Sequence, residues 1–447
     1  MRRALLALVL AIAPAALHAQ DFGSSRCVMV VDTMLRYRRV EVGPSLTFYA
    51  GGLVRLSCVG TTVKMQADSM MAVDNFKTTY FVGRVHYSDS TMDVTADRGT
   101  YFKEGERWEA RGNVVARNLR TNSTLRGPSL DYLRPIPGLR DTAQMYAISR
   151  PRIDYIPTDS GGKAQEPYVI NGDRVRFRGN DQVYAGGHVT IDRSDFGATS
   201  DSLRLDTGRG QDGALIGDAR MQGKGADPYT LTGRRILLRL GANELRGVRS
   251  TAQARAVTTE WDLVADTIDL ALAHSQLIQT LAWGDSTRPH AVNPEREIRA
   301  DSLAIDTPDR VPTEARLFGR GWVGAKADSG TGERDWLEGD SVVARFAPAD
   351  SGPKRNVLHQ VEARGKARSF YRVVDPNKPG PPSISYVRGD LIMLLMKSSG
   401  ANDVERVDVR GAVDGIQLQP IPPRPPDSTK TDSLRAPVDT LHRNGTR

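Results

Sequence analysis

Long apolar runs are almost absent from this chain of 447 residues. The exception is the N-terminus, where Arg2 and Arg3 precede an apolar run from Ala4 to Ala13 and small residues continue to Ala19. A membrane-spanning helix needs about 20 apolar residues, so this run is too short and has the pattern of a secretory signal peptide. We therefore expect a signal peptide over residues 1–19 and an exported, soluble mature protein.

Cysteine is also scarce, since Cys27 and Cys58 are the only two. Neither lies at the expected cleavage point, so a bacterial lipid anchor has no acceptor there. Exported chains meet an oxidising compartment, and we expect a Cys27–Cys58 disulfide that closes an entry segment over residues 20–50. Two unpaired thiols are the alternative. Two cysteines cannot supply the four ligands of a structural zinc ion.

Signatures of catalysis are equally sparse. The seven histidines never fall at metal-ligand spacing, and no phosphate-binding loop or dinucleotide fingerprint is present. G-D-S occurs at 284–286 and 339–341, and D-T-L-H at 439–442 offers a partner for an esterase-like Ser286. Both G-D-S copies occupy repeat positions, however, and a Pro-rich tail cannot preorganise a triad. The sequence predicts no enzyme, no metal site and no cofactor.

A repeated pair of short phrases is what the chain contains in abundance. The first phrase is a small residue, usually Asp, and then apolar residues two and four places after the Asp, as in S-D-S-L-R-L at 200–205. The second is Gly followed by small or β-branched residues at alternating positions, as in G-G-H-V-T-I at 186–191. The two alternate along most of the chain, and Y-A-G-G at 49–52 and 184–187 is their best-preserved form. A period of two indicates β-strands, and self-similarity at a fixed spacing indicates a repeat fold.

The phrases therefore predict an all-β protein, an elongated repeat β-jellyroll or open β-solenoid of facing antiparallel sheets. We expect Asp to accept backbone N–H groups in a turn at each strand entrance, and Gly to allow a bend between the sheets. One strand per phrase and about 4.8 Å between strands suggest facing sheets on the order of 50 Å long. The repeat domain is placed at residues 51–418, and the Pro-rich residues 419–447 are predicted to be a disordered tail.

The inward positions mix Leu, Ile and Phe with Ala, Val and Gly, so the interior is either an open apolar trough or a solid core. The formal net charge of +8 suits an anionic partner without identifying one. If a trough exists, its predicted lining is Val175, Phe177, Val189, Ile191, Leu203, Leu205, Ile236 and Leu238.

The order of these phrases resembles the OstA-like domain shared by the periplasmic lipopolysaccharide transport proteins LptA, LptC and LptD. The most similar stretch is A-D-R-G-T-Y-F-K-E-G-E-R-W-E-A-R-G-N-V-V-A-R-N at 96–118, and the likeness weakens from about Gly51 to Leu418. The resemblance implies a β-jellyroll whose apolar interior carries acyl chains, and subunits that stack edge to edge by strand addition. Three features depart from the family. The chain is much longer than a single-domain LptA, it has no following region of outer-membrane barrel strands, and it has no retained membrane helix, which argues against an LptC role. LptA is the member that the chain resembles most.

The resulting hypothesis is a lipopolysaccharide- or glycolipid-binding bridge to the outer membrane in the periplasm of a Gram-negative bacterium. Its implied partners are an acylated glycolipid and other β-jellyroll proteins of the same transport system; nucleic acid is not among them, and contact with membranes is peripheral. The alternative is a structural or adhesive β-solenoid with a solid core and no lipid cargo.

Overall fold

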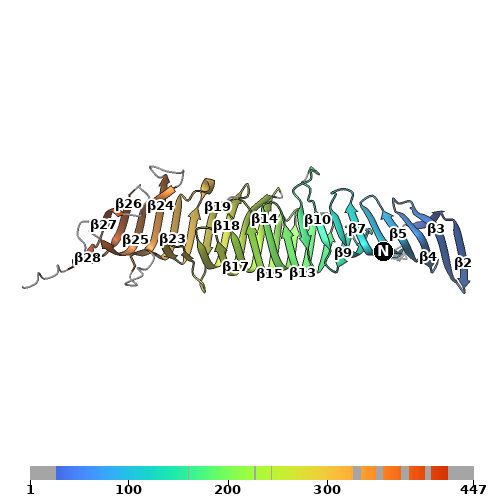
Figure 1. The fold of residues 1–447 in the computed structure, drawn as a ribbon, viewed down its shortest axis with the longest axis horizontal. Coiled ribbons are helices and arrows are strands. Elements are labelled where there is room, and N and C mark those ends of the chain that lie inside the picture. The colour runs from blue at the N-terminus through green and yellow to red at the C-terminus, as the bar shows by residue number, and fades with distance from the viewer. Residues whose placement is uncertain are drawn as a thin grey trace, which may run out of the picture.

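The computed structural model describes residues 27–159, 161–225, 228–242, 244–325, 334–348, 356–373, 382–397 and 404–420. The predicted signal peptide and residues 421–447 of the predicted tail lie outside these ranges. The described chain forms one long body of antiparallel strands, with β2 at one end and β28 at the other (Figure 1). This architecture confirms the expected all-β fold of facing antiparallel sheets.

Most strands follow one another by hairpin turns, and each pairs with the strand before it and the strand after it. The long strands are β3 (Ser45–Val59), β4 (Lys64–Val73), β5 (Thr78–Ser88), β6 (Met92–Phe102), β7 (Arg107–Asn118), β8 (Thr124–Leu133), β13 (Gln182–Asp192), β14 (Phe196–Asp206), β15 (Asp212–Gly223), β16 (Thr230–Gly241), β17 (Glu244–Val257), β18 (Asp262–Ala273), β23 (Glu314–Ala325), β24 (Trp336–Pro348), β25 (Asn356–Val373) and β26 (Ser383–Met396).

Other levels of the stack consist of two short strands that together pair with one long strand. One strand of each pair belongs to the first sheet: β2 (Arg36–Val42), β9 (Gln144–Ile148), β12 (Arg174–Arg178), β19 (Gln276–Trp283), β22 (Ser302–Asp306) and β27 (Val404–Arg410). The other belongs to the second sheet: β1 (Val28–Thr33), β10 (Arg152–Tyr155), β11 (Tyr168–Asn171), β20 (His290–Val292), β21 (Arg296–Arg299) and β28 (Asp414–Leu418).

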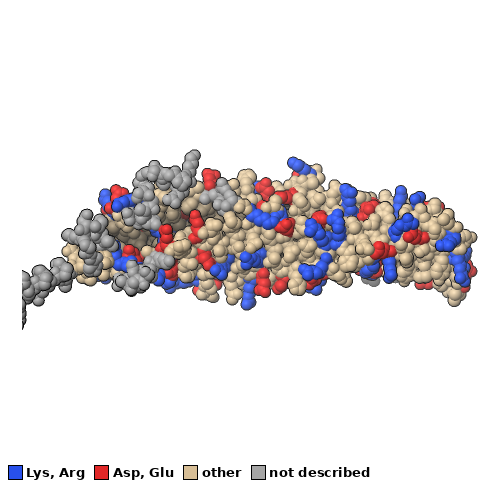
Figure 2. Space-filling model, viewed as in Figure 1, with Lys and Arg blue, Asp and Glu red and all other residues tan. Residues whose placement is uncertain are grey.

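The only described helix is a single 3-10 turn, Pro308–Arg310. Within the described ranges, then, no helix has the length and apolar character that crossing a bilayer requires. Basic and acidic side chains are interspersed along the face of the body seen in Figure 2. Charged side chains of both signs are therefore scattered among other residues over that face.

Each long strand bends near its middle, so that one half lies in the first sheet and the other half in the second. The bend appears in strand after strand as a shift in the pairing register, for example between Val82 and Val85 in β5 and between Ile216 and Ala219 in β15. At most bends a Gly and the residue after it both have positive φ, as in Gly217 and Asp218. Gly reaches such a φ without steric cost, so the Gly phrase marks the bend as expected.

The expected length was wrong because of this bend. A strand that bends supplies a level to both sheets, whereas the 50 Å expectation divided the strands between the two sheets. The 28 strands, with the short ones sharing levels, form a stack of about 20 levels, which at about 4.8 Å per level is on the order of 100 Å long.

The expected place of the Asp was also wrong, because it lies at the bend and not at the strand entrance. A Cβ atom added to the bend Gly of one strand would overlap the Asp side chain of the preceding strand. The Asp and Gly pairs are Asp68 with Gly83, Asp97 with Gly112, Asp173 with Gly187, Asp201 with Gly217, Asp301 with Gly319, Asp340 with Gly365, and Asp390 with Gly411. The carboxylate also binds the residue after the Gly in several pairs, as in Arg84 Nε to Asp68 Oδ1 at 2.8 Å. The two phrases alternate because each Asp strand packs against the Gly strand that follows it.

Replacing Gly217 with Ala should lower the free energy of unfolding by about 2–4 kcal/mol. Both the left-handed φ of +78° and the overlap with Asp201 oppose the new methyl group. Gly60 is the matched control, because it has the same φ of +78° but nothing within 4 Å of the added Cβ; Gly60→Ala should cost about 1 kcal/mol. Urea unfolding of the two variants measures the difference. An equal loss in both would show that the Asp contact does not restrict position 217.

A disulfide joins Cys27 to Cys58, with Cα atoms 4.8 Å apart. Cys58 lies in β3 and Cys27 immediately precedes β1, so the bond ties the first strand of the second sheet to its neighbour. Both cysteines are buried at this end of the core. Residues 28–50, within the predicted entry segment, contribute β1, β2 and part of β3 to the same two sheets.

Candidate functional site between the two sheets

In most strands every second residue points between the sheets, and these residues form one continuous apolar interior along the molecule. The buried cluster extends from Cys27 to Ile392, with residues such as Val407 and Val409 packed against it. Alternation places neighbouring inward side chains about 7 Å apart along a strand and about 5 Å apart between strands. Among the described residues the interior is thus a continuous apolar column rather than a series of separate cores.

Aromatic side chains fill this interior near the N-terminal end. Trp108 of the first sheet stacks on Tyr87 of the second with ring centroids 4.9 Å apart, and Phe81 lies 5.5 Å from Trp108. Gly99 provides the space, since a Cβ at that position would overlap the Trp108 ring. Because Trp108 and Tyr87 come from opposite sheets and touch, the interior is filled at this level.

A second aromatic group continues the filling. Tyr155 of the second sheet lies 5.9 Å from Phe177 of the first, and Tyr168 lies 6.1 Å from Tyr155 and 6.3 Å from Phe196. The sheets therefore remain in contact through the middle of the molecule.

Hairpin turns at the strand ends of one sheet meet those of the other sheet along a line, which we call the seam. Asp89, in a turn of the second sheet, is buried and accepts hydrogen bonds from Tyr87 Oη at 3.0 Å and Tyr132 Oη at 3.2 Å. Arg134, at the edge of the first sheet, places Nε 3.3 Å from the same carboxylate. Burial raises the pKa of both Tyr87 and Tyr132 well above the ordinary value, so these phenols remain donors to Asp89.

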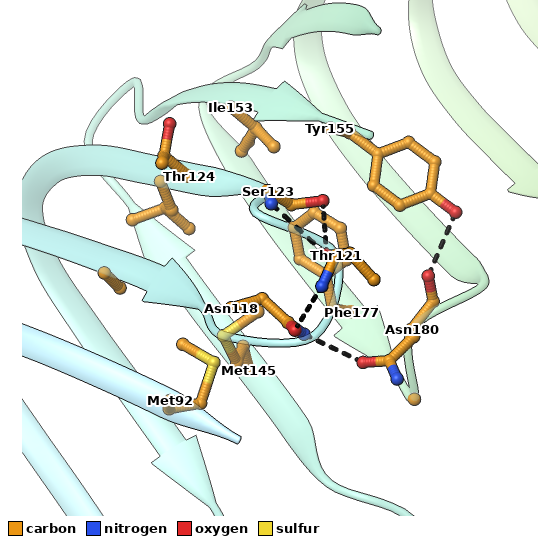
Figure 3. Close-up of a pocket in the computed structure, with 13 residues that line it drawn as sticks. Met92, Asn118, Thr121, Ser123, Thr124, Met145, Ile153, Tyr155, Phe177 and Asn180 are labelled. Carbon is orange, nitrogen blue, oxygen red and sulfur yellow. Dashed lines mark hydrogen bonds between the residues drawn. The ribbon is translucent and has the colours of Figure 1, made fainter. Parts of the chain in front are cut away.

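Further polar contacts close the seam toward the middle of the molecule. Asn118 Nδ2 donates to Asn180 Oδ1 at 2.9 Å, and Tyr155 Oη donates to the Asn180 carbonyl at 3.0 Å (Figure 3). The small cavity beside them has about 20 Å³ open to the centre of a water molecule, which is enough for about one water. Ser275 Oγ also donates to Asp195 Oδ2 at 3.3 Å.

The interior changes character after β18. Its inward residues, mainly small or aliphatic from β13 onward, include several after β18 that are only half-buried, as are Met29, Val31 and Phe48 at the N-terminal end. The half-buried residues packed against the core after β18 are Leu277, Ile298, Ile305, Val323, Ala344, Leu358, Leu394, Val407 and Val409. We call this set the C-terminal trough, because its apolar side chains retain contact with solvent.

All eight residues predicted to line a trough point into the interior of the middle segment. Val175, Phe177, Val189, Ile191, Leu203, Leu205, Ile236 and Leu238 are each between 0% and 5% exposed. They touch neighbouring side chains in the filled part of the interior, and their contact with a lipid stays a prediction. Sequence reasoning missed the C-terminal trough, although the change from inward aromatics to inward Ala and Val was a signal for it.

The esterase-like phrases lie at bends. The Asp266 carboxylate accepts the backbone N–H groups of Ser286 at 2.8 Å and Thr287 at 2.9 Å, so G-D-S at 284–286 forms the loop that replaces a bend. Asp340 of the other copy packs against Gly365, and D-T-L-H lies outside the described residues. Within the described ranges no group of three His, Cys, Asp or Glu side chains is arranged to hold a metal ion.

The fold and its interior define a class of protein, an elongated two-sheet β-repeat with a continuous apolar core. Neither models of known protein families nor curated protein sequences match this chain. Among solved structures, six chains match. One is LptH of Pseudomonas aeruginosa, described as the LptA-homologous periplasmic component of the lipopolysaccharide transport device. It has 15% sequence identity and a TM-score of 0.25, and the match covers 30% of this chain and 98% of that one.

Proposed function

We propose that this protein binds lipopolysaccharide or a related acylated glycolipid in the periplasm of a Gram-negative bacterium and forms part of a bridge to the outer membrane. The observation that supports the proposal is the apolar interior, which continues from level to level and reaches solvent in the C-terminal trough. The resemblance of the repeated phrases to the OstA-like domain supports the same function. This role requires binding and shielding but no catalysis by the chain.

The C-terminal trough is the part of the interior best suited to acyl chains. Transfer of one CH₂ group from water to an apolar site contributes about 0.8 kcal/mol, so a chain of a dozen carbons gains substantially from a dry channel. Inward side chains such as Ala344 and Val409 leave more room than the rings of the N-terminal half. We propose that cargo contacts the levels from β19 onward, and that the aromatic-filled half serves as a rigid extension.

Edge strands provide the proposed route to partners. Within the described ranges, β2 pairs only with β3 at one end, and β27 and β28 pair only with β26 at the other. Unpaired edge groups can accept an added strand from another β-jellyroll. Pairing at these edges would extend the interior into the next protein.

Photo-crosslinking tests the proposed cargo site. Leu394 points inward opposite Val407, whereas its neighbour Leu395 lies opposite Arg406 on the outer face. With a photoreactive phenylalanine at either position and added lipopolysaccharide, we expect crosslinking at position 394 to exceed that at position 395 by about tenfold or more, because only the inward position meets acyl chains. The same probe at Ile191 tests the predicted lining in the middle segment.

The outcomes separate the proposed function from the structural alternative. Crosslinks at 394 alone support loading of the C-terminal trough, and crosslinks at both 394 and 191 extend the cargo path through the molecule. Equal labelling at 394 and 395, or none, together with no acylated glycolipid in extracts of protein purified without detergent, would contradict lipid binding. The filled interior between Trp108 and Phe196 is the observation that favours the solid structural solenoid.

A further inference from the structure

A depression on the outer surface of the first sheet, at its N-terminal edge, is separate from the interior. Its volume is about 490 Å³, which is within the range of small-molecule sites. Two rows of paired residues cross its floor, since Arg36 lies opposite Gly51 and Arg38 lies opposite Tyr49. The rows continue with Ser69 and Val82, and with Met71 and Tyr80. The floor is therefore partly aromatic and its edge is basic.

The charge of the depression has one sign. Arg36 and Arg38 line it, and no Asp or Glu does. Among the described residues neither guanidinium has a carboxylate partner, whereas Arg39 of the same strand, opposite the inward Phe48, is paired with Glu41. Unpaired guanidinium groups bind carboxylate or phosphate through two parallel hydrogen bonds, so the depression is suited to an anion.

The second Y-A-G-G copy, at 184–187, has the same arrangement of Arg and Gly as the first. Arg174 lies over Gly186 as Arg36 lies over Gly51, because neither Gly has a Cβ to exclude the guanidinium. Arg176 then lies between two rings, 5.3 Å from that of Tyr146 and 5.9 Å from that of Tyr184.

The first copy has Tyr49 in the place of Tyr184 but lacks a ring in the place of Tyr146. Among the described strands β2 has only β3 beside it, so no described strand supplies an equivalent of the Tyr146 ring. Arg38 and the ring of Tyr49, which is 41% exposed, are left available to a ligand.

We propose that this depression binds a phosphorylated or carboxylated sugar. Arg36 and Arg38 would bind the anionic group, while Tyr49 and Tyr80, each 41% exposed, would face the apolar C–H surface of the sugar ring. Amphipathic aromatic rings combine such contact with a hydroxyl for hydrogen bonding. The inference does not depend on lipid in the interior.

Isothermal titration with glucose 1-phosphate, glucose and inorganic phosphate tests the site. Glucose 1-phosphate should bind at least about fivefold more tightly than either component, because the arginines and the tyrosines contribute together. The double variant Arg36→Gln with Arg38→Gln should weaken binding by about tenfold or more. Arg39→Gln is the matched control on the same strand and should change affinity less than twofold. Tyr49→Leu should reduce the preference for the sugar phosphate over inorganic phosphate.

Several results would overturn the proposal. Undetectable binding of glucose 1-phosphate, affinity equal to that of inorganic phosphate, or an equal loss in Arg39→Gln would each do so. Sedimentation with phosphatidylglycerol vesicles and sedimentation velocity of the protein alone distinguish the other occupants. If the double variant abolishes vesicle binding or self-association while glucose 1-phosphate does not bind, the arginines contact a membrane surface or a second copy, and no sugar site exists.

Discussion

Replacing Trp108 with alanine is expected to lower the free energy of unfolding by about 3–5 kcal/mol. Trp108 is 1% exposed and contacts Phe81 and Tyr87, so it joins the two sheets where the interior is filled. Gly99 has no side chain that can move into the vacated space. Because the surrounding strands are fixed by backbone hydrogen bonds to their neighbours on both sides, they cannot close the space, and a cavity remains.

The measurement is urea unfolding followed by far-ultraviolet circular dichroism. Trp283→Ala is the matched control, because Trp283 is 37% exposed and lies on the outer surface beside Arg249. The control should cost about 1 kcal/mol or less. Equal losses in the two variants would contradict the assignment of the N-terminal interior as a tightly packed segment.

Local patterning made the repeat and its bends predictable. Alternation in S-D-S-L-R-L and G-G-H-V-T-I identifies strands because the side-chain period of a strand is two, and recurrent Gly identifies bends because left-handed backbone favours it. The partner of each Asp was not predictable, since the pairing of Asp201 with Gly217 depends on which strands are adjacent. The length of the stack was mispredicted for a related reason. A single sequence does not show whether a Gly ends a strand or bends it, and therefore whether one strand contributes to one sheet or to both.

The seam and the trough depended on distant contacts. Asp89 meets Tyr132, Asn118 meets Asn180 and Asp195 meets Ser275 across separations of 43, 62 and 80 residues, and no short motif encodes such pairs. The side chains of the predicted lining at 175–238 are buried among their neighbours in the structure. The more interrupted C-terminal levels, where the phrases are weakest, leave the apolar interior in contact with solvent.

Alkaline solution is expected to unfold the protein steeply above about pH 10. Burial raises the pKa of five tyrosines above the ordinary value of about 10, and these are Tyr87, Tyr132, Tyr155, Tyr168 and Tyr229. Above pH 10 the unfolded chain releases these phenolic protons while the folded chain retains them. Because the unfolded state then binds fewer protons, stability falls as pH rises. The stability that these protonated phenols contribute is fully present below the pKa of the unfolded state, and it is lost as the pH rises toward the higher pKa values of the folded state.

The expected loss at pH 11 is about 1.4 kcal/mol for each tyrosine whose pKa is raised furthest, or about 6 kcal/mol for Tyr87, Tyr132, Tyr155 and Tyr229 together. Exposed tyrosines such as Tyr37 ionise with the strands intact, whereas the additional phenolate absorbance of the buried tyrosines should appear together with the loss of the circular dichroism signal. Tyr229→Phe removes one ionising group whose pKa is raised mainly by burial, and should restore about 1.4 kcal/mol at pH 11. Reversible ionisation of all thirteen tyrosines near pH 10 with the strand signal intact would show that the interior admits water, and would contradict the filled N-terminal half.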